Sequence, residues 1–199
     1  MIVLDIETSG LEPLRHSILS IGALDQLEPS NQFYGECCVW DGSDIQDEAL
    51  AINGFTRDDC FDTARAYEAE LITAFVAWAT SRPQVRILAA QNPSFDLEFV
   101  QAVCARAGIA CPFGKRTIDV HSLVWVHMQQ RGSVAPLDTK LRSGINLDYA
   151  LRYCGIPEEP KPHNALMGAK CHTEVISRIA YTKKALPEFT HFDIPWLTT

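Results

Sequence analysis

The amino-acid sequence predicts an α/β fold in a single domain, on three observations. Short apolar runs alternate with longer segments that carry apolar residues at helical spacing, which is typical of α/β layer folds. The first three strand candidates follow one another without a helix between them, which favours an antiparallel meander. The 199 residues, of which 47% are hydrophobic and 21% charged, suffice for one sizeable core.

Three strands and a short helix are expected in the N-terminal quarter of the chain. Residues 1–6 form a short apolar strand. Residues 16–24 and 31–40 are two further strand candidates, and the polar segment 25–31 is the expected turn between them. A short helix over residues 45–52 follows.

The middle of the chain predicts a long helix, a fourth strand and a second long helix. Residues 85–90 form the strand, and the helix after it has Asn92 as its N-cap, Pro93 at its first position and Gly108 as its stop. The preceding helix spans residues 64–79 and carries one apolar face, made of Tyr67, Leu71, Ala74, Phe75 and Trp78.

The C-terminal part is expected to add a short strand and three helices. Residues 116–132 read as a strand that runs into a helix, and residues 145–155 read as another helix. Asn164 is a good N-cap for the last helix, which ends near Tyr181. We expect the domain to end there, at residues 1–182, and the aromatic-rich tail 183–199 to pack on it.

Composition excludes several classes of protein. No apolar run approaches the roughly 20 residues that a membrane span needs, and the N-terminus has no basic region of a signal peptide, so a cytoplasmic location is expected. The seven cysteines show neither a CxxC pair nor zinc-ligand spacing and are expected to be reduced. The net charge of −8 argues against broad electrostatic capture of long nucleic acid, but bound divalent cations can invert such a field locally.

Three acidic residues are candidates for chemistry. Asp5 and Glu7 end the first strand, and residues two apart in a strand point to the same face. Asp96 lies in the first turns of the helix after the fourth strand, and the carboxyl ends of strands are where α/β sheets bind ligands. Carboxylate oxygens of this kind suit Mg²⁺ or Mn²⁺, although an acidic strand end and a residue that complements a helix dipole would explain each acid singly.

His163 is the candidate general base. It lies at the start of the last helix, in the segment KPHN. Taken alone, a loop histidine is more often structural. Beside a carboxylate metal site it can accept a proton from water near neutral pH.

Taken together, these stretches resemble the DEDDh (DnaQ-like) 3′→5′ exonucleases, which have an RNase H-like fold. The resemblance spans about residues 1–180, in the order and spacing of the family. DIETSGL resembles the first motif, QNPSFDLEF the second, and HNALMG the last, which is H-x-A-x-x-D in the family. ALAINGFT, TIDVHSL and LDYALRYCGIP resemble the segments between them.

The resemblance implies a five-stranded mixed sheet, with three antiparallel and then two parallel strands flanked by helices. It also implies two divalent cations, Mg²⁺ or Mn²⁺, on the order of 3.5–4 Å apart. Asp5 would bridge them, Glu7 would serve the ion that carries the attacking water, and Asp96 would serve the second. His163 would deprotonate that water, and the product would be a 5′-mononucleotide.

The resemblance further implies how the substrate is held. Leu11 resembles the family's wedge against the terminal base, and Thr8 and Gly10 would offer backbone contacts to the terminal nucleotide. Asn92 and Phe95 would lie near the substrate. The substrate would be a single-stranded RNA or DNA 3′ end, and the family leaves open a homodimer or a polymerase or RNA-processing partner.

The sequence departs from the family at one position. The family has an Asp five residues after the histidine, where this chain has Gly168. The loss of one anionic oxygen weakens cation binding and the activation of water, so we expect this chain to be strongly impaired. His172 lies one helical turn further on, but imidazole is a poor ligand for Mg²⁺.

Three functions follow in order of support. The retention of Asp5, Glu7, Asp96 and His163 favours a metal-dependent 3′→5′ exonuclease that acts on single-stranded or frayed ends. Gly168 favours a non-catalytic module that keeps the fold and binds nucleic-acid ends or a protein. An unrelated α/β enzyme or structural domain is disfavoured by the ordered set of motifs.

Overall fold

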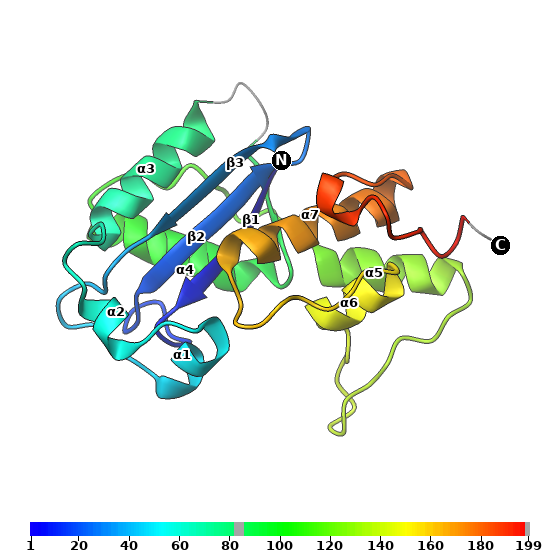
Figure 1. Cartoon of the computed structure of the whole chain (residues 1–199), viewed down its shortest axis with the longest axis horizontal. Coiled ribbons are helices and arrows are strands. Elements are labelled where there is room, and N and C mark those ends of the chain that lie inside the picture. The colour runs from blue at the N-terminus through cyan, green and yellow to red at the C-terminus, as the bar shows by residue number, and fades with distance from the viewer. Residues whose placement is uncertain (82–85, 198–199) are drawn as a thin grey trace.

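The computed structural model describes residues 1–81 and 86–197 and contains the five-stranded mixed sheet expected from the sequence (Figure 1). The strand order is β3-β2-β1-β4-β5. The first three strands are antiparallel, whereas β4 pairs parallel to β1 and β5 pairs parallel to β4. The strands are β1 (Ile2–Thr8), β2 (Ile18–Asp25), β3 (Glu28–Glu36), β4 (Leu88–Ala90) and β5 (Ile118–Asp119).

Helices cover both faces of the sheet. In Figure 1, α7 crosses in front of β1 and β2, with α5 and α6 beside it, while α3 and α4 lie behind. Two short helices, α1 and α2, lie near the end of the sheet where β1 finishes. The bounds are α1 (Asp47–Asn53), α2 (Arg57–Phe61), α3 (Glu68–Thr80), α4 (Pro93–Arg106), α5 (Val120–Gln130), α6 (Leu147–Tyr153) and α7 (Ala165–Tyr181), with a 3₁₀ turn at Pro187–Phe189.

The alternation of β1 divides the hydrophobic core into two layers. Leu4 belongs to the cluster that includes α3 and α4, and Val3 belongs to the cluster that includes α5, α6 and α7. Successive side chains of a strand point to opposite faces, so Asp5 and Glu7 lie on the same side as Val3. The two carboxylates therefore face the side of the sheet that α7 covers.

Three predicted boundaries were wrong. The turn expected at 25–31 shrinks to two residues because β3 begins at Glu28, and this edge strand leaves its polar residues exposed, so it needs no apolar run. β3 also ends earlier than predicted, at Glu36 instead of residue 40. The helix expected from residue 64 begins at Glu68, because Glu70 caps the backbone N–H of Tyr67 and fixes the start there. Residue 85, the predicted start of the fourth strand, lies outside the described residues.

The chain after α7 returns to the body of the protein. Leu186 and Phe189 are buried in the cluster that includes α5, α6 and α7, and Ile194 is buried as well. Within the described part of the chain, no helix combines the length and the apolar character that crossing a membrane requires. The proposed boundary between residues 182 and 183 stays a prediction.

Candidate active site

The three predicted acidic residues meet at the end of β1. Asp5 and Glu7 come from β1, and Asp96 comes from the first turn of α4, where it is buried. Burial is the main cause of the raised pKa of Asp5, and the charges of Glu7 and Asp96 raise it further. The side chains are thus close enough to repel one another, as expected for acids that follow neighbouring strands.

Burial also raises the pKa of the other two acids. Burial, followed by the charges of Glu159 and Asp96, raises the pKa of Glu7 to about 8. Burial raises the pKa of Asp96 to about 7, although the backbone N–H of Ile6 offsets part of the change. Carboxylates that are buried together without a counter-charge favour protonation or a bound cation.

The site opens into a cavity of about 310 Å³ that contains two acids missed by the sequence analysis. Asp148 from α6 and Glu159 from the loop before α7 line it together with Asp5, Glu7 and His163. Burial and the charge of Asp148 raise the pKa of Glu159 to about 7. The sequence analysis gave neither residue a role, although Asp148 lies in the segment LDYALRYCGIP, because a separate helix and a loop bring them to the site.

His163 lines this cavity from the loop before α7. Its backbone N–H donates to the carbonyl oxygen of Ile52 at 3.0 Å, which ties the loop to α1. Its ring Nδ1 lies 3.9 Å from Oε2 of Glu159, and about a third of the side chain is exposed. The imidazole is therefore reachable from solvent and has a carboxylate on one side.

Gly168 lies against Asp5. A Cβ atom placed on Gly168 would lie 2.0 Å from Oδ2 of Asp5, so the Asp5 carboxylate occupies the space that a side chain there would need. Ala165 lies one turn before Gly168 in α7, and its backbone would lie 2.2 Å from a Cβ placed on Gly22 of β2. The two glycines let the N-terminal end of α7 lie directly on β1 and β2.

His172 lines the cavity from α7 but is tied to the sheet. Its Nδ1 lies 3.0 Å from the carbonyl oxygen of Leu4, which can only accept, so Nδ1 carries the proton. Burial lowers the pKa of His172 to about 4. The side chain is therefore neutral near pH 7.

The predicted substrate contacts lie in the turn after β1. The Thr8 hydroxyl donates to the carbonyl oxygen of Gly10 at 2.7 Å. A Cβ on Gly10 would lie 2.1 Å from the ring of His16, so only glycine fits beside that ring. Leu11 follows with 70% of its surface exposed. An apolar side chain held this far into solvent is available to contact a ligand.

Asn92 and Phe95 lie at the start of α4. Asn92 is the N-cap, as predicted, but it has a left-handed backbone (φ 57°), and its side chain accepts from the Ser94 hydroxyl instead of a backbone N–H. Its backbone N–H donates to Asp119 at 3.1 Å. Phe95 is partly buried, with its ring centroid 5.0 Å from that of Phe99.

The acidic side chains suit a divalent cation chemically. Among the described residues no three Asp, Glu, His or Cys side chains are already arranged as a metal site, so the carboxylates must adjust around an ion. The donors are nevertheless oxygen atoms of the kind that Mg²⁺ and Mn²⁺ prefer. One of them, Oε1 of Glu159, is buried without a hydrogen-bond partner in the described structure.

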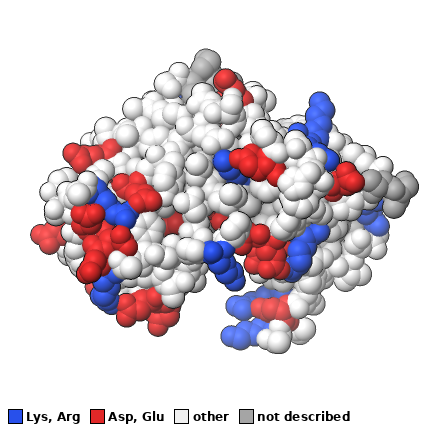
Figure 2. All heavy atoms as spheres, viewed as in Figure 1, with Lys and Arg blue, Asp and Glu red and all other residues white. Residues whose placement is uncertain are grey.

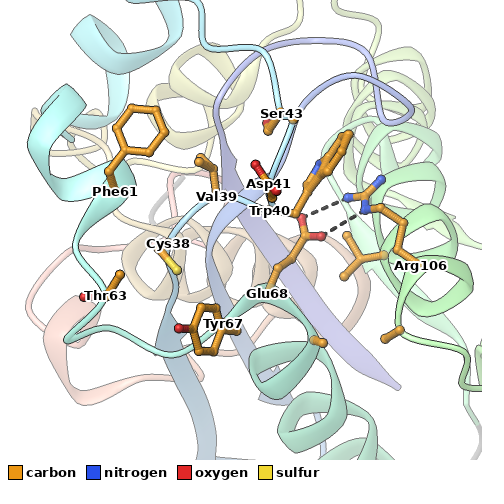
Figure 3. A pocket seen from close by; sticks show the side chains of 14 residues that line it. Cys38, Val39, Trp40, Asp41, Ser43, Phe61, Thr63, Tyr67, Glu68 and Arg106 are labelled. Atoms are coloured by element: carbon orange, nitrogen blue, oxygen red, sulfur yellow. Dashed lines mark hydrogen bonds and ion pairs between the residues drawn. The ribbon is translucent and has the colours of Figure 1, made fainter.

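A second cavity, of about 440 Å³, lies apart from these acids (Figure 3). Trp40, Phe61 and Tyr67 line it, and none of the predicted site residues does. Its one acid–base pair is Glu68 with Arg106, whose Nη2 lies 2.9 Å from Oε1 of Glu68. A carboxylate that is already paired with a guanidinium is a poor candidate for catalysis, so the smaller cavity is the candidate active site.

A mixed sheet whose first strand carries two carboxylates, beside a third at a helix start, defines the class of RNase H-like nucleases. A family model described as "RNase_T: Exonuclease" matches residues 2–175. The chain belongs to this exonuclease family.

Solved structures agree with this fold. E. coli exonuclease I in complex with a 5cy-dT13 oligonucleotide superposes with a TM-score of 0.71 at 16% identity, over 92% of this chain and 40% of that one. Its zinc-bound complex with single-stranded DNA gives a TM-score of 0.71 at 16% identity, over 91% and 40%. Exonuclease I from Methylocaldum szegediense gives 0.70 at 21%, over 92% and 41%. The chain thus spans about two fifths of the length of these structures.

Proposed function

We propose that this chain is a divalent-metal-dependent 3′→5′ exonuclease that releases 5′-mononucleotides from single-stranded or frayed ends. The observation that carries the proposal is the meeting of Asp5, Glu7 and the buried Asp96 at the end of β1, where Asp5 and Glu7 line a cavity together with His163. Membership of the exonuclease family and the likeness to exonuclease I bound to single-stranded DNA support it.

The acids would hold two cations, Mg²⁺ or Mn²⁺. Asp5, Glu7 and Asp96 are the proposed ligands. Bound cations supply positive charge that stabilises the phosphoryl oxygens and the leaving oxygen. The cations would also offset the repulsion among the three carboxylates.

His163 is the proposed general base. With Nδ1 turned toward Glu159, the imidazole has Nε2 free to accept a proton from water. The water oxygen forms a bond to phosphorus, the bond from phosphorus to the 3′-oxygen breaks, and that oxygen takes up a proton. The released nucleotide carries a 5′-phosphate, and the shortened strand has a new 3′-hydroxyl.

The proposed substrate is a single-stranded DNA end, with RNA left open. Leu11 would contact the terminal base, Thr8 and Gly10 the terminal nucleotide, and Asn92 and Phe95 the strand beyond it. On the face in Figure 2, basic and acidic side chains are interspersed and the area over the sheet carries few charges. Such a surface suits a short end held in a pocket better than a long duplex held by charge.

Gly168 bears on the rate. We expect lower activity than in a protein with an Asp at this position. If the loss is complete, the alternative function applies, which is a catalytically inactive module that binds nucleic-acid ends or a protein. The same proposal includes a cytoplasmic location and a domain boundary at residue 182. It also includes a partner, either a second copy of the chain or a polymerase or RNA-processing protein.

A labelled oligonucleotide tests the proposal. A single strand with a 5′ label is incubated with the protein and Mn²⁺, and the products are separated by length. A ladder of shortening 5′-labelled products indicates removal from the 3′ end. His163→Ala should abolish the ladder, whereas His191→Ala, which changes an exposed histidine of the tail, should leave it intact. A wild-type protein that binds the strand but never shortens it supports the inactive module instead.

A further inference from the structure

We propose that Glu159 supplies the fourth carboxylate of the metal site, in the place of the side chain that Gly168 lacks. The inference rests on the proposed function and concerns the same site. It assigns a ligand to a residue that no motif of the sequence marks.

Glu159 is a buried carboxylate that lines the cavity, and one of its oxygen atoms lacks a hydrogen-bond partner among the described residues. It is 6% exposed, and it lines the cavity with Asp5, Glu7 and His163. Its Oε1 is buried and has no hydrogen-bond partner within the described residues. A buried oxygen without a partner is costly, on the order of 1–3 kcal/mol, and a bound ion or water would remove that cost.

The cavity offers no cationic side chain to neutralise this carboxylate. None of the described residues that line it is a Lys or an Arg, and the nearest cationic candidate is His163, with Nδ1 at 3.9 Å from Oε2. Glu159 and Glu7 line the same cavity. Glu159 thus adds negative charge close to a proposed ligand, which a cation would balance.

Gly168 has no side chain to offer, and in this arrangement the Asp5 carboxylate lies in the space beside it. The Asp5 carboxylate fills the space beside Gly168, as the 2.0 Å approach to an added Cβ shows. The fourth carboxylate must therefore come from another element. Asp148 is a weaker candidate, because it is half-buried and one of its oxygens lies 3.4 Å from the backbone N–H of Glu159.

The loop holds Glu159 at a fixed place relative to His163. Pro160 and Pro162 lie between the two residues, and the ring of proline fixes φ near −65°. The backbone of His163 is held by Ile52, and Asn164 then caps α7. A side chain on such a constrained loop can serve as a ligand without a large loss of entropy.

A Mn²⁺ titration tests the inference without substrate. The binding of Mn²⁺ is measured by calorimetry for the wild-type protein and for three variants, Glu159→Gln, Glu158→Gln and Glu7→Gln. Glu158 is the matched control, because it is the neighbouring acid, it is exposed and it pairs with Arg152 on the surface. Thermal unfolding in chelator shows whether each variant is folded.

The expected result is at least about tenfold weaker Mn²⁺ binding for Glu159→Gln and no change for Glu158→Gln. Unchanged affinity in Glu159→Gln, with weakened affinity in Glu7→Gln, would overturn the role of Glu159 and leave the metal site intact. Absence of Mn²⁺ binding in the wild-type protein would instead overturn the proposed metal-dependent function. If Glu159→Gln fails to fold, Glu159→Ala replaces it in the same titration, with the same two outcomes.

Discussion

The two ends of α7 differ in the buried charges beside them: one has a carboxylate paired with a guanidinium, and the other has carboxylates without a guanidinium. Near the C-terminal end, Arg178 and Glu174 are both buried, and Nε of the arginine donates to Oε1 of the glutamate at 2.8 Å. Near the N-terminal end, Asp5 and Glu7 of β1 lie among other carboxylates with no guanidinium in the cavity. One end of the helix thus holds a balanced pair, and the other covers an unbalanced cluster.

The balanced end also satisfies the remaining atoms of the pair. The two terminal nitrogens of Arg178 donate to four backbone carbonyl oxygens, three of them in the tail. Oε2 of Glu174 accepts from the backbone N–H groups of Ala185 and Leu186. Burial of charge is tolerated when every donor and acceptor is used, as at this end, whereas the carboxylates at the other end have no such partners, and their burial costs stability.

The largest expected effect comes from the unbalanced end. Glu7→Gln should lower nuclease activity by at least about a thousandfold, because a proposed ligand is lost. In chelator near pH 7 the same variant should melt at a higher temperature than the wild type, since folding no longer has to protonate the side chain at position 7 or bury its charge. Parallel activity and unfolding measurements check both effects. A variant that is less stable without metal would contradict the contrast between the two ends.

The next effect concerns the balanced end. Arg178→Ala should destabilise the protein by about 3–5 kcal/mol, because Glu174 would be left buried without a partner. Denaturant unfolding of wild type and variant measures the change. Arg152→Ala is the control, since it removes an exposed ion pair with Glu158 that contributes only about 0–1 kcal/mol. Equal losses of unfolding free energy in the two variants would show that the buried pair contributes no more to stability than the exposed one.

The pH dependence should follow mainly from the three raised carboxylates of the unbalanced end, which outnumber the opposing contribution of His172, whose pKa is lowered to about 4. The pKa values of Glu7, Asp96 and Glu159 lie at about 8, 7 and 7 in the folded protein, above their ordinary values of 4.5, 3.8 and 4.5. The folded state therefore binds more protons than the unfolded state, and stability falls as pH rises from about 4 to 8, by up to about 1.4 kcal/mol per pH unit for each group. Unfolding in chelator at several pH values checks the sign, and Mn²⁺ should flatten the slope.

The smallest effect concerns the exposed turn. Leu11→Ala should change the free energy of unfolding by less than about 0.5 kcal/mol, because the side chain is mostly in solvent. It should slow nucleotide release by about threefold to tenfold, the loss of about 1 kcal/mol of base contact. Leu27→Ala, which changes a similarly exposed leucine in the β2–β3 turn, should leave the rate unchanged. Equal rates for both variants would remove Leu11 from the substrate contacts.

Local patterns predicted the elements that position the site. The alternation of β1 placed Asp5 and Glu7 on one face, and Asn164 caps α7 through its side chain, as its residue type indicated. The start of β3 was missed because an edge strand does not need apolar residues. Glu159 was missed because only the tertiary path of its loop brings it to β1, and a loop has no periodicity to interpret.

Gly168 needed the structure for a different reason. From the sequence, the glycine indicates a missing ligand. In the fold, the Asp5 carboxylate fills the space beside it, so glycine at position 168 also affects how closely α7 packs on β1. Local propensity contains no information about such contacts.

The contact between Gly22 and Ala165 has a consequence for how this protein can vary. Backbone atoms of a strand and a helix set the separation there, with no side chain between them. A side chain at position 22 would therefore push the first turn of α7 away from β2, and with it the adjoining loop that carries His163. A family of variants that keeps this active site should keep glycine at position 22.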